Sequence, residues 1–276
     1  MLLTPDELRF DFGGARFKLP EDRELLGWIF SQSLFGEATG CYCGAALYAA
    51  PDIEAATFLS KQAVEEFSHF RQFLRIFQLL RVQPQAPHPI MRFLTSHETL
   101  WDHHVALEMA VGEGLVLAVF YALIDTLDEP EIVRLLTTIA RQEAGHVAFG
   151  ETQTMKAIQG RPRLARQLLG LNVLSLEAAR RLAGVVISRS GKADHPVVKQ
   201  IPTFVTHAIQ TTELRLQRMG LTDRPLSAYS RREKLALVLE GLAARQVRQF
   251  LEPEKPRIPS TYLQDPVLLE MMKGIA

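Results

Sequence analysis

Two Glu-x-x-His pairs occur at matched positions in this chain of 276 residues. In each half of the pattern a single glutamate precedes the glutamate of the pair, by 29 residues in the first half and by 30 in the second. The residues concerned are Glu37, Glu66, His69, Glu113, Glu143 and His146. One such pair is a common coincidence, but two with the same spacing, inside helical sequence, predict a binding site. Four carboxylates and two imidazoles are the ligands that a four-helix bundle supplies to two iron or manganese ions.

The spacing places these residues on shared helix faces. Residues three apart in a helix lie about one turn from each other, so each Glu-x-x-His pair offers an oxygen and a nitrogen to one ion. Apolar residues accompany the ligands at helical spacing, for example Leu59 and Phe73 around the first pair. The six side chains are therefore expected to point into a core. The alternative is a set of exposed helix glutamates, which would be the better interpretation of any one of them alone.

The donor set indicates which metal is bound. Hard carboxylate oxygens with one imidazole per ion suit iron or manganese better than zinc. Two of the four carboxylates can bridge the ions, and four glutamates buried without a metal would be unfavourable. We expect two iron ions, with a mixed manganese–iron pair as the alternative. Glu108 is a weaker candidate than Glu113 because it breaks the matched spacing, while Glu54 and Glu65 are expected to face solvent or to support the ligands.

Helical periodicity from residue 21 onward predicts an all-α fold. Four helices are expected, with caps or breaks at Pro51, Pro84, Thr95 with Glu98, Asp128 and Gly160: 21–49, 51–83, 95–127 and 128–160. Three amphipathic stretches follow at 162–188, 197–219 and 231–250, and then a proline-rich tail at 253–266. We predict a single domain, 1–276, with the di-metal bundle at 21–160 and additional helices and the tail at 161–276. Residues 8–19 alternate apolar and polar positions and allow a short hairpin.

Composition favours a cytoplasmic protein that does not span a membrane. The N-terminus lacks the pattern of a secretory signal, and the longest apolar stretch, 115–124, is shorter than a bilayer requires. Cys41 and Cys43 are one residue apart in helical sequence, so they are poorly placed to bridge each other. Residues 1–155 carry a net charge of −10 and residues 156–276 a net charge of +10. The basic half is expected to be solvated or to pair with the acidic half, with docking of an anionic partner as the alternative.

The constellation resembles the ferritin-like di-iron carboxylate superfamily. The resemblance covers residues 25–155 and rests on Phe35-Gly36-Glu37-Ala38, Glu66-Phe67-Ser68-His69, Gly112-Glu113-Gly114 and Glu143-Ala144-Gly145-His146-Val147-Ala148-Phe149-Gly150. Within the superfamily, the chain is more similar to oxidases of the ribonucleotide-reductase small-subunit type and to bacterial multicomponent monooxygenases than to ferritins. The resemblance implies a ferritin-like four-helix bundle with additional C-terminal helices, in which two irons reduce O₂.

Three positions depart from the pattern of these relatives. Many relatives place an Asp before the Glu of each pair, where it orients the histidine of the other pair, whereas this chain has Glu65 and Gln142 there. Radical-forming reductase subunits carry a Tyr four residues after the first histidine, and Phe73 at that position argues against a stored tyrosyl radical. Several hydroxylases carry a Thr at the position of Leu117, so the resemblance transfers no proton relay to this residue.

Several neighbours of the ligands have more than one interpretation. Glycines at positions 36, 40, 44, 112 and 114 indicate room for a substrate, a helix bulge or close helix packing. Cys41, one turn after Glu37, is expected to face the metals or a pocket wall as a small core residue. Three histidines at the start of the third helix are expected to be solvated: His97, His103 and His104.

The leading functional hypothesis is a non-haem di-iron oxidoreductase that uses O₂ to hydroxylate, N-oxygenate or desaturate a small or carrier-tethered organic substrate. We predict no catalytic residue beyond the six ligands and no further cofactor. An external electron donor is required, and a homodimer is allowed. One alternative is a ferritin-like iron-binding or ferroxidase protein, against which the 116 residues after Gly160 count. Another is an RNA-modifying di-iron hydroxylase, which the balanced overall charge does not favour.

Overall fold

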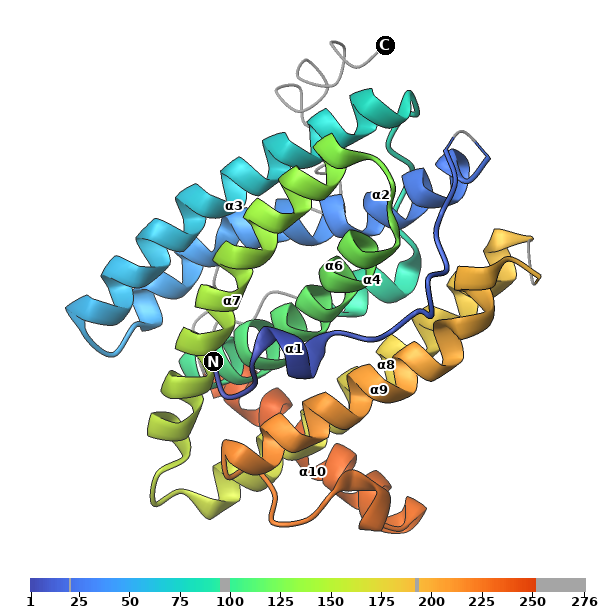
Figure 1. Cartoon of the computed structure of the whole chain (residues 1–276). Helices are drawn as coiled ribbons and strands as arrows, with labels where there is room; N and C mark the ends of the chain where they lie inside the picture. The colour runs from blue at the N-terminus through green and yellow to red at the C-terminus, as the bar shows by residue number, and fades with distance from the viewer. Residues whose placement is uncertain (20, 95–99, 192–193, 252–276) are drawn as a thin grey trace.

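The computed structural model describes residues 1–19, 21–94, 100–191 and 194–251, and within these residues the chain is all-α, as predicted (Figure 1). The long helices are α2 (Arg23–Gly40), α3 (Ile53–Leu80), α6 (Gly114–Thr126), α7 (Pro130–Ile158), α8 (Pro162–Ser190), α9 (Pro196–Arg218) and α10 (Arg231–Leu251). The short ones are α1 (Pro5–Leu8), α4 (Pro89–Leu94), α5 (Trp101–His103) and the 3₁₀ turn η3 (Leu226–Ala228). The predicted tail at 253–266 lies outside the described residues.

Four helices enclose the main core. Helix α2 packs beside α3, α6 packs beside α7, and α3 also contacts α7. Phe30 of α2, Phe73 of α3 and Phe120 of α6 are fully buried between them. The rings of Phe30 and Phe120 lie 6.0 and 5.9 Å from the ring of Phe73. This arrangement is compatible with the predicted four-helix bundle.

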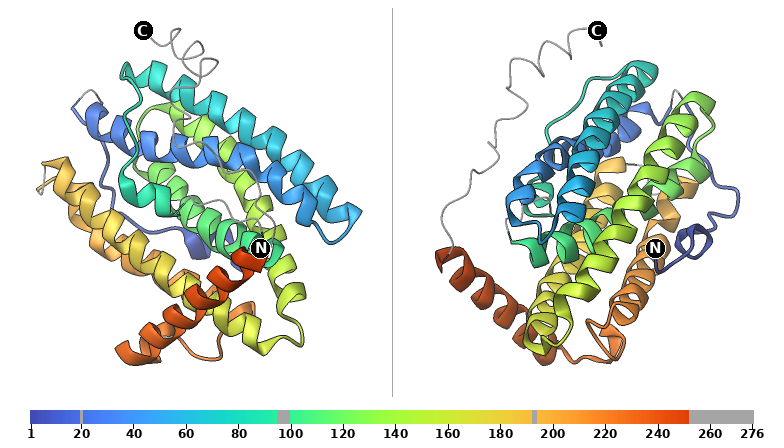
Figure 2. Two further views of the ribbon diagram at one scale, coloured as in Figure 1. Left: turned by 180° about the vertical axis from the view of Figure 1, so that it is seen from behind. Right: turned by 90° about the vertical axis from the view of Figure 1, so that its left-hand side faces the viewer.

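Helices α8, α9 and α10 pack outside these four. Figure 2 shows α10 crossing over α8. The helices approach closely at two glycines, because a Cβ on Gly170 would overlap the backbone of Leu237 and a Cβ on Gly241 would lie 2.7 Å from the carbonyl oxygen of Gln167. One apolar cluster joins α8, α9 and α10 to residues of the third bundle helix. The additional C-terminal helices are therefore packed on the bundle.

Side chains near the helix ends set the boundaries. Asp52 accepts a hydrogen bond from the amide three residues later at 2.8 Å, so α3 begins at residue 53, after Pro51. Glu129 is the N-cap residue of α7 in place of the predicted Asp128. Arg81 ends α3 in the left-handed conformation with a φ of 54°. The predicted capping box of Thr95 and Glu98 lies outside the described residues.

Two of the four predicted bundle helices are not regular along their length. After α2 the chain continues as a 3₁₀ segment, η1 (Cys41–Ala49). Between α5 and α6 it forms a π-helix, η2 (His104–Glu113). Such π-helical segments are frequent at functional sites. Segment η1 begins four residues after Glu37 and η2 ends at Glu113, so each irregularity adjoins one of the two single glutamates, and a helix bulge is present at the second.

Residues 8–19 form no strand, so the short hairpin that the alternating pattern allowed is absent. The Phe17 amide donates to the carbonyl of Thr126 at 2.9 Å. The rings of Phe10 and Phe12 lie 5.9 and 5.7 Å from the ring of Phe204 on α9. The alternating apolar side chains are therefore buried against helices, which satisfies the same pattern without a second strand.

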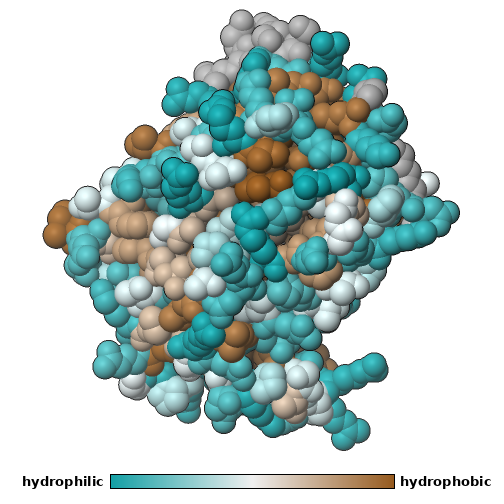
Figure 3. All heavy atoms as spheres, in the orientation of Figure 1, coloured by the Kyte–Doolittle hydropathy of each residue, from teal (hydrophilic) through white to brown (hydrophobic). Residues whose placement is uncertain are grey.

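One continuous helical stretch, Trp101–Thr126, is long and apolar enough to cross a membrane by length and composition alone. Half of its most apolar window is buried inside the protein, where it packs on α7 and α9. The core helix of a bundle passes the same test, so this helix is only weak support for a membrane span. On the face drawn in Figure 3, hydrophobic side chains form patches that are separated by hydrophilic ones.

Candidate metal centre

The structure brings all six predicted ligand residues together in the interior. They come from four segments: Glu37 from α2, Glu66 and His69 from α3, Glu113 from the end of η2, and Glu143 and His146 from α7. Five of them are at most 5% exposed, which excludes the alternative of exposed helix glutamates for the three glutamates among these five. The Glu113 side chain is 21% exposed. The helical spacing in the sequence was sufficient to predict that these side chains point into the interior.

Four of the residues form a first group that could hold one ion: Glu37, Glu66, His69 and Glu143. Each offers one ligand atom, and these atoms lie within 4.8 Å of one another. The Nδ1 atom of His69 is 3.0 Å from Glu37 Oε2 and 3.1 Å from Glu143 Oε1. It is also 3.5 Å from Glu66 Oε2. The group is buried on all sides.

A second group consists of Glu66, Glu113 and His146. The Nδ1 atom of His146 is 3.4 Å from Glu66 Oε1 and 4.0 Å from Glu113 Oε2. Glu66 belongs to both groups and turns a different oxygen to each. Glu143 likewise directs Oε1 toward His69 and Oε2 toward His146, the latter at 3.6 Å. Each of these two glutamates therefore presents one oxygen to each histidine, an arrangement that could bridge two cations.

Hydrogen bonds behind the two histidines fix which nitrogen faces inward. His146 Nε2 lies 2.9 Å from Glu65 Oε2, and His69 Nε2 lies 3.0 Å from Gln142 Oε1. The Gln142 amide nitrogen donates to Glu65 Oε1 at 3.3 Å. A carboxylate only accepts, so Gln142 must turn its NH₂ to Glu65 and its oxygen to His69. Both Nε2 atoms then carry a hydrogen, so the Nδ1 atom of either ring, once it loses its proton, would offer its lone pair to a metal.

Gln62 is a site residue that the sequence did not reveal. It is 1% exposed, and its amide nitrogen donates to Glu113 Oε1 at 2.9 Å, across 51 residues of sequence. The same nitrogen is 3.4 Å from Glu66 Oε1. Its position one turn before Glu66 on the ligand face was the available signal. Gln62 holds Glu113, the ligand candidate with the greatest exposure.

Without a metal, burial and the neighbouring charges change the protonation of the centre. Burial raises the pKa of Glu37 well above its usual value despite the hydrogen bond from His69, and burial together with the charge of Glu143 raises the pKa of Glu113. Burial opposes protonation of His146, but its contact with Glu143 and the charges nearby raise its pKa to about 10. In the metal-free protein, protons therefore occupy the centre that cations would fill.

Several buried atoms of the ligand residues lack a hydrogen-bond partner among the described residues and are therefore available to bind cations. Within the six ligand residues, three buried atoms have no hydrogen-bond partner in the described part of the chain: Glu113 Oε2, Glu143 Oε2 and His146 Nδ1. Buried polar atoms of this kind are unfavourable unless something coordinates them. Carboxylate oxygens with one imidazole nitrogen per group suit iron or manganese. The buried cluster could therefore bind metal, and its donor chemistry fits two ions.

The histidines near the third helix were predicted wrongly. His103 and His104 are 1% and 2% exposed, not solvated. This helix begins inside the protein, where α5 packs against α7, so its first turn is covered. His104 Nδ1 lies 2.5 Å from Glu108 Oε2, and Glu108 belongs to neither ligand group. His97 lies outside the described residues.

The glycines near the ligands mostly permit close packing. A Cβ on Gly40 would lie 2.8 Å from Glu66 Oε2, and a Cβ on Gly114 would overlap the guanidinium of Arg215. Only the Cβ position of Gly36 faces open space among these three. Cys41 lies beside Glu66 and Glu37, and burial with these charges raises its pKa to about 12, so it remains a neutral thiol. Both cysteines are free, as expected.

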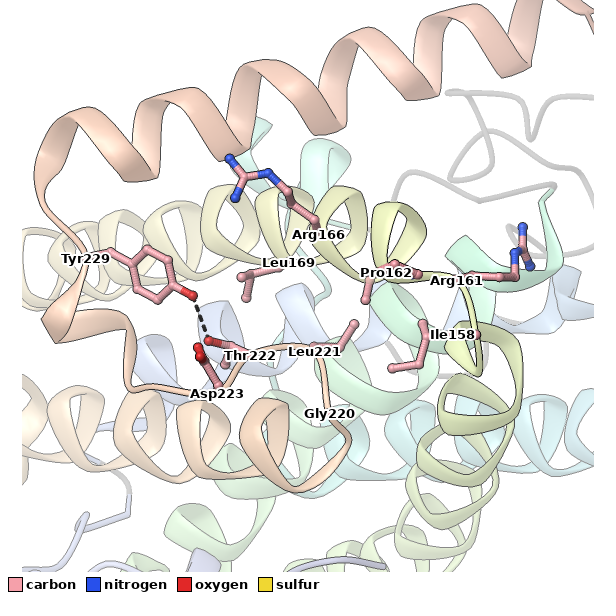
Figure 4. Close-up of a pocket in the computed structure, with 12 residues that line it drawn as sticks. Ile158, Arg161, Pro162, Arg166, Leu169, Gly220, Leu221, Thr222, Asp223 and Tyr229 are labelled. Carbon is pink, nitrogen blue, oxygen red and sulfur yellow. Dashed lines mark hydrogen bonds between the residues drawn. The ribbon is translucent and has the colours of Figure 1, made fainter.

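A groove of about 400 Å³ lies at the corner between α7 and α8, away from the six ligands (Figure 4). Tyr229 forms one wall, and its hydroxyl is 2.9 Å from Thr222 Oγ1. The two arginines that line the groove have acidic partners. Arg166 Nε lies 2.6 Å from Glu240, and Arg161 lies 3.6 Å from Asp102. The groove therefore lacks an uncompensated charge that would select an anion.

Ion pairs connect the basic half to the acidic half, which confirms part of the predicted pairing. Arg248 lies 2.8 Å from Asp102, and Arg215 lies 2.8 Å from Glu151. The second pair is almost completely buried, and sequence reasoning did not identify it. The available signal was the position of Arg215 on the buried stripe of α9, three residues after Thr212.

Comparison of the sequence with known protein families and with proteins of established function found no match.

Proposed function

We propose that this protein is a non-haem di-iron oxidoreductase that uses O₂ to oxidise a small or carrier-tethered organic substrate. The observation that carries the proposal is the pair of buried ligand groups that share Glu66 and have both histidine Nδ1 atoms turned inward. Four ionised carboxylates would balance the charge of two divalent ions. Bound iron would supply the reductive activation of O₂.

In this proposal, the protein's own residues would bind the metal ions, orient the ligands and shield the centre from water. Glu65 and Gln142 hold the imidazoles in the metal-binding tautomer, and Gln62 holds Glu113. Next to the second group, the ring of Phe58 lies 6.2 Å from the ring of His146 and stacks on Phe149 at 3.8 Å. This aromatic pair keeps one wall of the centre dry, which strengthens electrostatic interactions inside it.

The partners in this proposal follow from the chemistry. Oxygen activation needs electrons, which an external donor in the cytoplasm would supply. A substrate on an anionic carrier would meet the basic half, where Arg163 is exposed at the start of α8. The alternative of iron storage is not favoured, because α8, α9 and α10 form a large addition to the bundle.

Metal content and oxygen uptake test the proposal together. Purified apo protein is loaded anaerobically with Fe²⁺ and freed of excess iron. We expect two irons per chain, and O₂ uptake that continues with a chemical reductant without loading further iron. Iron in large excess of two per chain would support the ferroxidase alternative. Fewer than two irons per chain, or no uptake of O₂ by the loaded protein, would contradict the proposal.

Electron paramagnetic resonance tests the radical alternative. Phe73 is fully buried one turn after His69 and has no phenol to oxidise. After exposure of the Fe²⁺ protein to O₂, we expect no persistent tyrosyl radical signal from this position. If the wild-type protein gives a long-lived radical signal, and the Phe73→Tyr variant gives the same signal, another residue stores the radical.

A further inference from the structure

A fully buried arginine from α9 connects to the segment that presents Glu113. Arg215 is 1% exposed. Its Nε donates to Glu151 Oε1 on α7 at 2.8 Å, and its Nη2 donates to the carbonyl of Ala110 in η2. The other oxygen of Glu151 accepts a hydrogen bond from the amide of Leu2 at 2.6 Å. One guanidinium thus ties α9, α7 and η2 together at a point three residues before Glu113.

The π-helical form of η2 explains why the contact between Arg215 and the Ala110 carbonyl matters. A π-helical turn departs from the regular pairing of each carbonyl with the amide four residues later, so it needs support that an α-helix does not. The Ala110 carbonyl lies in η2 and accepts from Arg215. In addition, a Cβ on Gly150 would lie 2.7 Å from the Ala110 backbone nitrogen, so α7 packs directly on this turn. Segment η2 is therefore held by contacts with both α7 and α9.

The glycine after the ligand makes room for the arginine. A Cβ on Gly114 would overlap the Arg215 guanidinium. The small residue beside Glu113 therefore admits a side chain from another helix and opens no space for substrate. A buried ion pair adds little stability compared with well-packed apolar residues of the same size. Stability alone is thus a weak reason to place an arginine here, and the geometry of η2 is a stronger one.

We propose that Arg215 is a positioning residue, which with Glu151 holds η2 in the π-helical form that brings Glu113 into the second ligand group. The inference rests on the proposed metal site but not on any turnover. The hydrogen bonds and the ion pair described for Arg215 involve Glu151 and the Ala110 carbonyl and no ligand side chain, so it acts through the backbone of Ala110. The first ligand group, which contains no residue of η2, is independent of it.

Arginine-to-lysine exchange separates position from charge. Arg215→Lys keeps a cation beside Glu151 but loses the planar fork that reaches two acceptors. Co²⁺ titration of the full-length apo protein, followed by visible absorption, measures the two sites. We expect the first ion to bind as in wild type and the second about 10- to 100-fold more weakly, the range found for residues that orient ligands. Arg180→Lys, at an exposed arginine of α8 that pairs with Glu177, is the matched control and should change neither.

Hydrogen exchange of the metal-free protein gives an independent measurement. In Arg215→Lys the amides of residues 104–114 should exchange faster than in wild type, while those of α2 and α3 stay unchanged. Gly114→Ala should produce the same local pattern by displacing the guanidinium, and it covers the case in which Arg215→Lys does not fold.

The outcomes separate this inference from the proposed function. Equal weakening of both sites, or full affinity at the second site in both variants, would overturn the inference while leaving a di-metal protein intact. A wild-type protein that binds no Co²⁺, Mn²⁺ or Fe²⁺ would overturn both.

Discussion

The two halves of the ligand pattern build subsites that differ in closure. The first single glutamate, Glu37, lies on a regular α-helix, is 5% exposed and lies 3.0 Å from its histidine. The second, Glu113, ends a π-helix, has a side chain that is 21% exposed and lies 4.0 Å from its histidine. Both positions can draw on four residues, because Glu143 also directs its second oxygen toward His146 at 3.6 Å. Nearly equal spacing in the sequence has therefore produced unequal sites.

The difference in exposure between the two groups indicates which of two bound ions would be accessible to other ligands. A fully enclosed group with four protein ligands suits an ion that keeps its coordination shell. A group with a partly exposed carboxylate, which water can reach, leaves a place for a non-protein ligand, as catalytic metal sites generally do. The surroundings also differ, because His146 hydrogen-bonds a carboxylate whereas His69 hydrogen-bonds an amide. We expect the second ion to be the one that meets substrate.

Removal of the shared ligand should have the largest effect. Glu66→Ala deletes an oxygen from both groups, so we expect metal content to fall from two ions per chain to near zero after dialysis, measured by elemental analysis. Glu54→Ala, an exposed glutamate on the same helix, should retain both ions. A Glu66→Ala protein that still binds one ion tightly would show that the two groups do not share this residue.

The two single glutamates should separate the subsites. Glu37→Ala should leave one ion per chain, because no water can readily replace a carboxylate in the enclosed group. Glu113→Ala should retain two ions, with the second bound about 10- to 100-fold more weakly, since water can enter beside a partly exposed ligand. Competitive titration with a metal indicator measures both. Identical losses in the two variants would remove the distinction between a closed and an open subsite.

A smaller and more selective effect is expected at the outer hydrogen bonds. Glu65 accepts hydrogen bonds from both His146 and Gln142. A glutamine at this position would turn its NH₂ group toward one of these two donors, so one hydrogen bond would be lost. Glu65→Gln should therefore weaken the second ion by about tenfold and affect the first less. The readout is the same titration, with Glu54→Gln as the control. Equal weakening at both ions would mean that Glu65 supports the bundle as a whole.

The pH dependence of the metal-free protein should be the mildest effect. The pKa of His146 is raised from 6.5 to about 10, so its stabilisation is complete below pH 6.5 and is lost as the pH rises through 10. The raised pKa values of Glu37 and Glu113 act in the same direction, because these carboxyls lose their protons at a cost as the pH rises.

Over that range the melting temperature of the chelator-treated protein should fall, by about 2–4 °C for each 1 kcal/mol lost. The metal-loaded protein should melt higher and change less, because cations replace the protons. Differential scanning calorimetry of both forms compares them. A metal-free protein that becomes more stable toward pH 10 would contradict a centre of buried carboxylates and histidines.

Local pattern was sufficient to predict much of this protein. The all-α fold, the helix pairs and the six candidate residues follow from the 3.6-residue period and from the i, i+3 spacing of Glu66 with His69 and Glu143 with His146. These depend only on residues close together in the chain. The alternating pattern at 8–19 allowed a hairpin that the structure does not contain. Such a pattern indicates which side chains are buried but not which element covers them.

Only the tertiary structure decided how closed each subsite is and what holds it. Gln62 meets Glu113 across 51 residues, and Arg215 meets the Ala110 carbonyl across 105. The burial of His103 and His104 likewise depends on α7, which follows them in the chain. Short-range periodicity carries no information about such contacts. They arise when packed helices leave buried polar atoms that a side chain from another helix must satisfy.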